Sequence, residues 1–173
     1  MSKPPREPYP PDPDEEAEPV TEFAGELVDA TVVDADWANI KGFRFSAQRT
    51  AFTRCRLTGA ELGEASLQDV TFADCRIDLA GLRASRLERI VFRDCRLGET
   101  EFSAARLKDV LFEGCELREA TFSGAKIERV ELRGCDLTSL RGVEALRGAR
   151  LRWEDAIEAA PLFAAALGIE LVE

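Results

Sequence analysis

The cysteines are the residues whose type and spacing first suggest chemistry. They number five and recur at intervals of twenty, as Cys55, Cys75, Cys95, Cys115 and Cys135. Such thiols could form a metal site, a redox relay or disulfides. A straight column of thiols, however, does not offer the tetrahedron that zinc needs, and a strand spacing of about 4.8 Å is too long for a disulfide between Cβ atoms. We therefore expect reduced thiols that serve as small core residues.

The remaining composition argues against catalysis. The chain of 173 residues contains no histidine, which removes the commonest general base and the commonest zinc ligand. It also contains no phosphate-binding loop and no Cys-x-x-Cys pair. We expect a protein that is not an enzyme and that uses no cofactor and no metal.

A repeat of five residues positions these cysteines. Every fifth residue from Phe52 to Leu137 is Leu, Ile or Phe, and the residue two places earlier is small or β-branched. A period of five fits neither an α-helix nor a straight strand, so the chain must turn a corner once per repeat. Because the cysteines repeat every twenty residues, four such sides complete one coil, and equivalent residues stack from coil to coil. This pattern predicts a solenoid with a square cross-section.

The chain resembles the pentapeptide-repeat proteins, whose unit is usually written Ala-(Asp/Asn)-Leu-x-x. The segments Ala60-Glu61-Leu62-Gly63-Glu64 and Ala65-Ser66-Leu67-Gln68-Asp69 show the pattern, and the clean match covers residues 50–139. The resemblance implies an all-β fold, a right-handed quadrilateral parallel β-helix with about 20 residues per coil, to which we add a C-terminal α-helical cap. Some members of the family protect DNA gyrase by imitating duplex DNA.

Two sets of outward charges follow from the stacking. Asp69, Arg89, Asp109 and Arg129 alternate in sign in one column, which predicts a ladder of salt bridges. On another side, acidic residues outnumber basic ones, and these form a candidate acidic interaction strip: Glu61, Glu64, Glu99, Glu101 and Glu119. Five carboxylates spread over several coils are too sparse to imitate the phosphates of DNA closely.

Apolar residues suggest two further contact surfaces. Val91 and Leu111 occupy outward positions one coil apart, and we interpret them as an incidental exposure or as a contact for a partner, the N-terminal tail or a second copy. Solenoid ends need caps. The apolar residues after the repeats form the candidate C-terminal cap or dimer surface: Ile157, Leu162, Phe163 and Leu167.

The chain divides into three predicted parts. Residues 1–22 hold seven of the eight prolines and half of the net charge of −10, so we expect a disordered, solvated tail. Residues 23–153 form the β-helix, with a bulge near Gly42 where the repeat is interrupted and a last strand containing Leu151 and Trp153. Residues 154–173 form the cap, with one helix before Pro161, a second after it, and a final strand over residues 169–172.

These features favour a non-enzymatic module that binds another protein, whose identity the sequence does not reveal. The alternative is a DNA mimic that binds and protects DNA gyrase, with a homodimer formed through the C-terminal segment. We expect a cytoplasmic protein without a membrane anchor, because the first residues form no secretory signal, and we expect no direct binding to nucleic acid, because no side carries enough positive charge.

Overall fold

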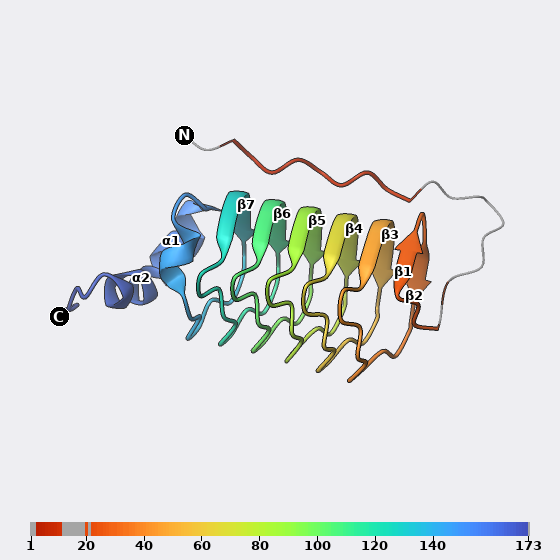
Figure 1. Cartoon of the computed structure of the whole chain (residues 1–173). Helices are drawn as coiled ribbons and strands as arrows, with labels where there is room; N and C mark the ends of the chain where they lie inside the picture. Colours follow the sequence, from red (N-terminus) through yellow and green to blue (C-terminus); the bar gives the residue numbers. More distant parts are fainter. Residues whose placement is uncertain (1–2, 12–19, 21, 173) are drawn as a thin grey trace.

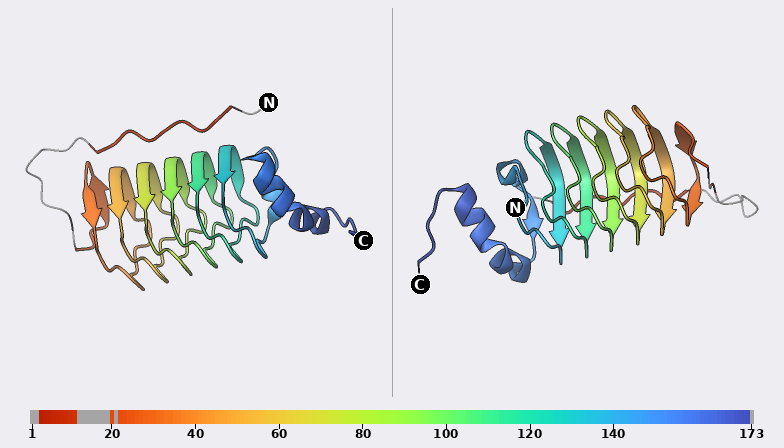
Figure 2. Two further views of the ribbon diagram at one scale, coloured as in Figure 1. Left: turned by 180° about the vertical axis from the view of Figure 1, so that it is seen from behind. Right: turned by 90° about the horizontal axis from the view of Figure 1, so that it is seen from below.

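The chain forms a straight rod of stacked coils with short helices at its C-terminal end (Figure 1). The computed structural model describes residues 3–11, 20 and 22–172. Residues 3–11 run back along the outside of the rod toward its C-terminal end (Figures 1 and 2). Among the residues described, no helix is long and apolar enough to cross a membrane.

The strands form one parallel sheet whose spatial order is β1-β3-β4-β5-β6-β7-β8, with β2 also paired to β3. Each strand from β1 to β6 pairs with the residues twenty positions further along, as in Phe72 with Phe92 and Phe92 with Phe112, whereas β7 pairs with β8 at an interval of nineteen. The strands are β1 (Glu26–Val28), β2 (Thr31–Val33), β3 (Ser46–Thr53), β4 (Ser66–Ala73), β5 (Arg86–Arg93), β6 (Arg106–Glu113), β7 (Lys126–Arg133) and β8 (Arg150–Leu151). The predicted parallel solenoid with twenty residues per coil is confirmed.

The corners of the square are set by the backbone. Every fifth residue from Asp29 to Ser139 has a positive φ, between 45° and 69°. This left-handed conformation turns the chain by one side, and glycine, aspartate and asparagine tolerate it best. Each strand from β3 to β7 spans two sides with such a corner inside it, while the other two sides are linked from coil to coil by isolated bridges.

Identical side chains stack inside the rod. The rings of Phe72 and Phe92 lie 5.0 Å apart and nearly parallel, and those of Phe92 and Phe112 lie 5.1 Å apart. A second column on the opposite wall places Phe102 and Phe122 4.8 Å apart, and it meets the first column edge to face. Both columns are fully buried apart from a trace at Phe72. The interior is therefore a continuous core along the rod axis.

The first complete coil keeps the register, so the prediction of a bulge near Gly42 is wrong. Lys41 bridges Glu61, and the Gly42 N–H donates to the Glu61 carbonyl at 3.0 Å, as the repeat requires. A Cβ at Gly42 would lie 2.7 Å from the ring of Phe23, which packs into the space that a leucine fills in later coils. The ring of Phe23 also meets Trp37 at 5.3 Å, so Phe23 closes this end of the core.

The other end is closed by three short helical segments, η1 (Val143–Leu146), α1 (Trp153–Glu158) and α2 (Ala160–Ala166). Pro161 lies in the first turn of α2, as predicted, where its missing N–H costs nothing. Trp153 begins α1 instead of ending a strand, and residues 169–172 form no strand. The predicted final strand is therefore wrong, because the chain after α2 leads away from the stacked strands (Figures 1 and 2).

Candidate functional site

The cysteine column lies inside the rod and consists of free thiols. Each thiol donates to a carbonyl of the preceding coil, as Cys95 Sγ does to the Phe72 carbonyl at 3.4 Å. On another wall, the Ser85 hydroxyl makes the same contact with the Leu62 carbonyl. The small inward position of the repeat therefore accommodates either a thiol or a hydroxyl. The neighbouring thiols of Cys115 and Cys75, together with burial, raise the pKa of Cys95. Four of the five thiols are buried and the fifth, Cys135, is half-buried, so this column is a packing element of the core.

The predicted charge ladder is confirmed, and its pairs are bidentate. Arg89 Nε and Nη2 donate to the two oxygens of Asp69 at 2.6 and 2.9 Å, and Arg129 donates in the same way to Asp109 at 2.6 and 2.8 Å. Two coils before the Asp69–Arg89 pair, Arg49 donates two hydrogen bonds of 2.5 Å to the carboxylate of Asp29. We call this set, from Asp29 to Arg129 in steps of twenty, the ladder column. Each aspartate is thus fixed in orientation by the arginine of the next coil.

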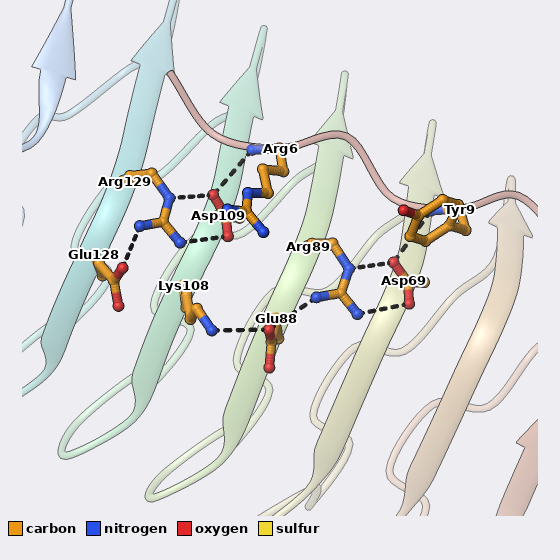
Figure 3. Close-up of polar contacts among 9 residues, drawn as sticks. All are labelled: Arg6, Tyr9, Asp69, Glu88, Arg89, Lys108, Asp109, Glu128 and Arg129. Carbon is orange, nitrogen blue, oxygen red and sulfur yellow. Dashed lines mark hydrogen bonds and ion pairs between the residues drawn. The ribbon is translucent and has the colours of Figure 1, made fainter. Parts of the chain in front are cut away.

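A second column supports the ladder column from the side. Glu88 accepts from Arg89 Nη1 at 2.8 Å and from Lys108 Nζ at 3.0 Å, so it links two neighbouring coils. Glu128 accepts in the same way from Arg129 (Figure 3). Arg89 and Arg129 are consequently held on two sides, which restricts their rotamers.

We call the surface formed by the ladder column and by the neighbouring column of Glu88, Lys108 and Glu128 the ladder face. The N-terminal segment, residues 3–11, lies lengthwise on this ladder face (Figures 1 and 3). The Arg6 N–H donates to Asp109 Oδ1 at 3.0 Å, and the Tyr9 N–H donates to Asp69 Oδ1 at 3.1 Å. The guanidinium of Arg89 lies 6.0 Å from the centroid of the Tyr9 ring, within cation–π range. Residues 3–11 therefore do not form the predicted disordered tail, because fixed carboxylates accept hydrogen bonds from the Arg6 and Tyr9 N–H groups. Residues 1–2, 12–19 and 21 of that predicted tail lie outside the described part.

These contacts shift the acidity of both aspartates in the same direction. Hydrogen bonds from Arg129 lower the pKa of the Asp109 carboxyl most strongly; burial opposes them, and the Arg6 N–H adds to the lowering. Burial pushes the pKa of Asp69 upward, but the bonds from Arg89 and from the Tyr9 N–H outweigh it, so the pKa lies below its ordinary value. Both aspartates are therefore charged acceptors at neutral pH.

Val91 and Leu111 lie two residues after the ladder column, on the side of the square that begins at the ladder corner. Val91 is only 7% exposed although its position points outward, so the expectation that it is exposed is wrong. Leu111 is half-buried. The N-terminal segment crosses the coil of Val91 between its two anchors on Asp109 and Asp69. Of the three contacts considered for this pair, the tail is the one that this arrangement favours.

The acidic strip lies on a different side and is partly neutralised. Glu61 and Glu101 share one column of bridges, and Glu99 and Glu119 share a corner column. Glu64 pairs with Arg44 at 3.1 Å and Glu119 with Arg141 at 3.4 Å. In the described part of the chain, no ion pair of 4.0 Å or less engages Glu61, Glu99 or Glu101. The strip therefore offers three uncompensated carboxylates.

The C-terminal cap splits the predicted apolar surface in two. Leu162 and Phe163 pack against the core, whereas Ile157 is 57% and Leu167 73% exposed. The cap is tied to the last coil by Asp155, which accepts from the Gly134 N–H at 2.9 Å and from Arg152 at 3.1 Å. Half of the predicted cap surface thus closes the core and the other half faces outward.

The sequence analysis missed Arg6 and Tyr9 as functional residues. Their contribution is a backbone N–H, which no side-chain pattern indicates. The prolines carried a signal nonetheless, because Pro4, Pro5, Pro8, Pro10 and Pro11 leave N–H groups only at intervals within the segment. No group of three or more acidic, cysteine or histidine side chains suited to a metal ion occurs among the residues described.

Comparison with known proteins places these observations in a family. The model of the pentapeptide repeat region matches residues 45–122 and 80–141. No curated protein matches the sequence significantly.

Among solved structures, a trypsin-treated form of QnrB1, a plasmid-mediated fluoroquinolone resistance protein, is 21% identical with a TM-score of 0.39, over 86% of this chain and 97% of its own. HetL, a pentapeptide repeat protein involved in heterocyst differentiation regulation in the cyanobacterium Nostoc sp. strain PCC 7120, is 19% identical with a TM-score of 0.33, over 72% of this chain and 71% of its own. With twenty residues per coil and a family match over more than half of its length, this chain belongs to the pentapeptide repeat proteins.

Proposed function

We propose that this protein is a non-enzymatic binding module, a rigid rod that holds an extended segment of another protein along its ladder face. The observation that carries this proposal is the seating of residues 3–11 on Asp69 and Asp109. A surface that already binds an extended segment of its own chain has the chemistry needed to bind a similar segment from a partner. We place this binding in the cytoplasm, where free thiols persist.

Rigidity is the property that suits the ladder face to this task. The coils are tied by parallel pairing along the whole rod and by stacked rings inside it. The bidentate pairs fix the carboxylates before a ligand arrives, so little side-chain entropy is lost on binding. A preorganised row of acceptors is what an extended peptide backbone requires.

Site-specific photo-crosslinking in the native cell tests this function. A photoreactive residue at Leu111, beside the ladder column, should yield an adduct with one defined protein. The matched control at Leu79, which is 55% exposed on another corner, should not yield that adduct. Equal adducts at both positions, or none at Leu111, would contradict the proposal.

A second candidate is a DNA mimic that binds and protects DNA gyrase. The observation in its favour is the uncompensated charge of Glu61, Glu99 and Glu101 on one part of the surface. The exposed Ile157 and Leu167 would then join two rods into a homodimer. We place it second, because ion pairs occupy Glu64 and Glu119, which interrupts the row of charges that would stand in for phosphates.

Two measurements decide on this second candidate. In a supercoiling assay, the protein should protect DNA gyrase from a fluoroquinolone, and the triple substitution Glu61→Gln, Glu99→Gln and Glu101→Gln should abolish the protection. Light scattering should show a dimer that Leu167→Glu converts to a monomer. An unchanged assay would leave the ladder-face function standing and remove the mimic.

A further inference from the structure

The N-terminal segment meets the rod with a period of three residues. Its N–H contacts come from Arg6 and Tyr9, three positions apart. Pro5, Pro8 and Pro11 are half-buried, whereas the described residues between them are exposed. A polyproline II helix has three residues per turn, so one edge of such a helix faces the rod.

On the rod, the aspartates that accept hydrogen bonds from the segment recur once every two coils. Asp69 and Asp109, which receive the two N–H groups, are forty residues apart, and Arg89 lies between them in the same column. Two coils advance the column by about 9.6 Å, since parallel strands lie about 4.8 Å apart. One turn of polyproline II advances by about 9.3 Å. The two repeats therefore match to within a few tenths of an ångström.

The alternation of charge in the ladder column makes this match selective. An aspartate in every coil would present acceptors at half the spacing of the ligand, and charges of one sign would repel each other. With an arginine in alternate coils, each aspartate is oriented by two hydrogen bonds and still accepts a third from the ligand. Arg89 makes a contact with the Tyr9 ring, so this arginine also takes part in binding.

We propose that the ladder face is a recognition site for proline-rich segments in the polyproline II conformation, supplied by a partner protein. The site reads a proline at every third position followed by a residue with a free N–H, as in Pro5-Arg6 and Pro8-Tyr9. Residues 3–11 are a built-in competitor that occupies the site until a stronger ligand displaces it. This inference rests on the proposed binding function and names the class of its partner.

The charges of the segment agree with this assignment. Arg6 follows the first half-buried proline and lies above Asp109, and Tyr9 follows the second and lies above the Asp69–Arg89 pair (Figure 3). A basic or aromatic residue after each inward-facing proline therefore suits the ladder column. A ligand with acidic residues at both positions would meet Asp69 and Asp109 with like charge.

The test uses the full chain and a labelled peptide with the sequence of residues 3–11. The double substitution Arg6→Pro and Tyr9→Pro removes both N–H donors from the built-in segment while keeping it rich in proline. Fluorescence anisotropy should show that this variant binds the peptide about tenfold more tightly than the unsubstituted chain, whose own segment competes at a high local concentration. The Glu7→Pro variant keeps both donors and should behave like the unsubstituted chain.

A second peptide, with proline in place of both donor residues, should bind to neither chain. Failure of the double variant to bind the first peptide, or equal binding of both peptides, would overturn the inference. A dimer of the unsubstituted chain that dissociates in the double variant would show that the occupant is a second copy, which would overturn the assignment to a partner. Photo-crosslinking of a partner without a proline-rich segment would overturn this inference and leave the proposed function intact.

Discussion

The ladder face and the acidic strip carry the same kinds of charged groups, and they differ in what covers them. On the ladder face, Asp69 pairs with Arg89 beneath the N-terminal segment, and their side chains are 4% and 15% exposed, respectively. On the strip, the paired side chains of Glu64 and Arg44 are 49% and 72% exposed. Opposite charges at the spacing of one coil are therefore present on both sides, but only one side holds them rigidly.

The difference indicates that burial, in addition to the charge pattern, decides how rigidly an ion pair is held on this rod. Exposed pairs contribute little, because water screens them and their side chains lose entropy on pairing. Pairs that are largely removed from water, such as Asp69–Arg89, hold a fixed geometry and present a directed acceptor. The predictions below test this contrast.

The largest loss of stability should come from the buried core, and it should be the same on the ladder side and on the strip side. Phe92→Ala on the ladder side and Phe102→Ala on the strip side should each lower the free energy of unfolding by about 3–5 kcal/mol, since each breaks a ring stack in a buried column. Denaturant unfolding followed by circular dichroism measures both. A loss confined to one variant would show that the two walls differ inside as well as outside.

The next effect should separate the two sides. Asp69→Asn should lower the free energy of unfolding by about 2 kcal/mol, because it removes a charged partner from a shielded arginine. The matched change Glu64→Gln on the strip should cost no more than about 0.5 kcal/mol. Equal losses in the same unfolding experiment would contradict the contrast drawn here.

Acid should release the N-terminal segment. The pKa values of Asp69 and Asp109 are lowered in the folded protein, so the contribution of their contacts is complete above the ordinary value of 3.8 and is lost as the pH falls through the lower folded values. Tyr9 is the single tyrosine of the chain, so fluorotyrosine labelling gives one ¹⁹F signal. That signal should keep its position down to about pH 4 and change below it.

The groups that contact these carboxyls are Arg89 and the Tyr9 N–H at Asp69, and Arg129 and the Arg6 N–H at Asp109. Since the arginines stay charged throughout, the transition reports the aspartates. The Asp69→Asn variant should show a weaker transition, and a signal that moves between pH 5 and 7 would disprove the assignment.

The smallest effect belongs to the strip. Glu61→Gln and Glu101→Gln should change the free energy of unfolding by less than about 0.5 kcal/mol and leave the ¹⁹F signal of Tyr9 in place. A change in that signal would show that the strip communicates with the ladder face, and the two regions would then no longer be independent.

The repeat in the sequence was sufficient to predict the coil, the cysteine column and the ladder column, because each follows from a fixed interval. The exchange between Phe23 and Gly42 was not predictable in this way, since a residue outside the repeat compensates for a missing leucine in a later segment. The docking of residues 3–11 depends on the match between two unrelated periods, one of three residues and one of forty. Only the folded chain brings those periods side by side.

The two-coil alternation of Asp and Arg has a consequence for how such a rod can lengthen. Duplicating a single coil would put an arginine where the ligand needs a carboxylate and would throw every later anchor out of phase. Duplicating coils in pairs would add one more anchor and room for three more ligand residues. The lineage of this protein is therefore expected to grow and shrink by even numbers of coils, with ligand length following in steps of three.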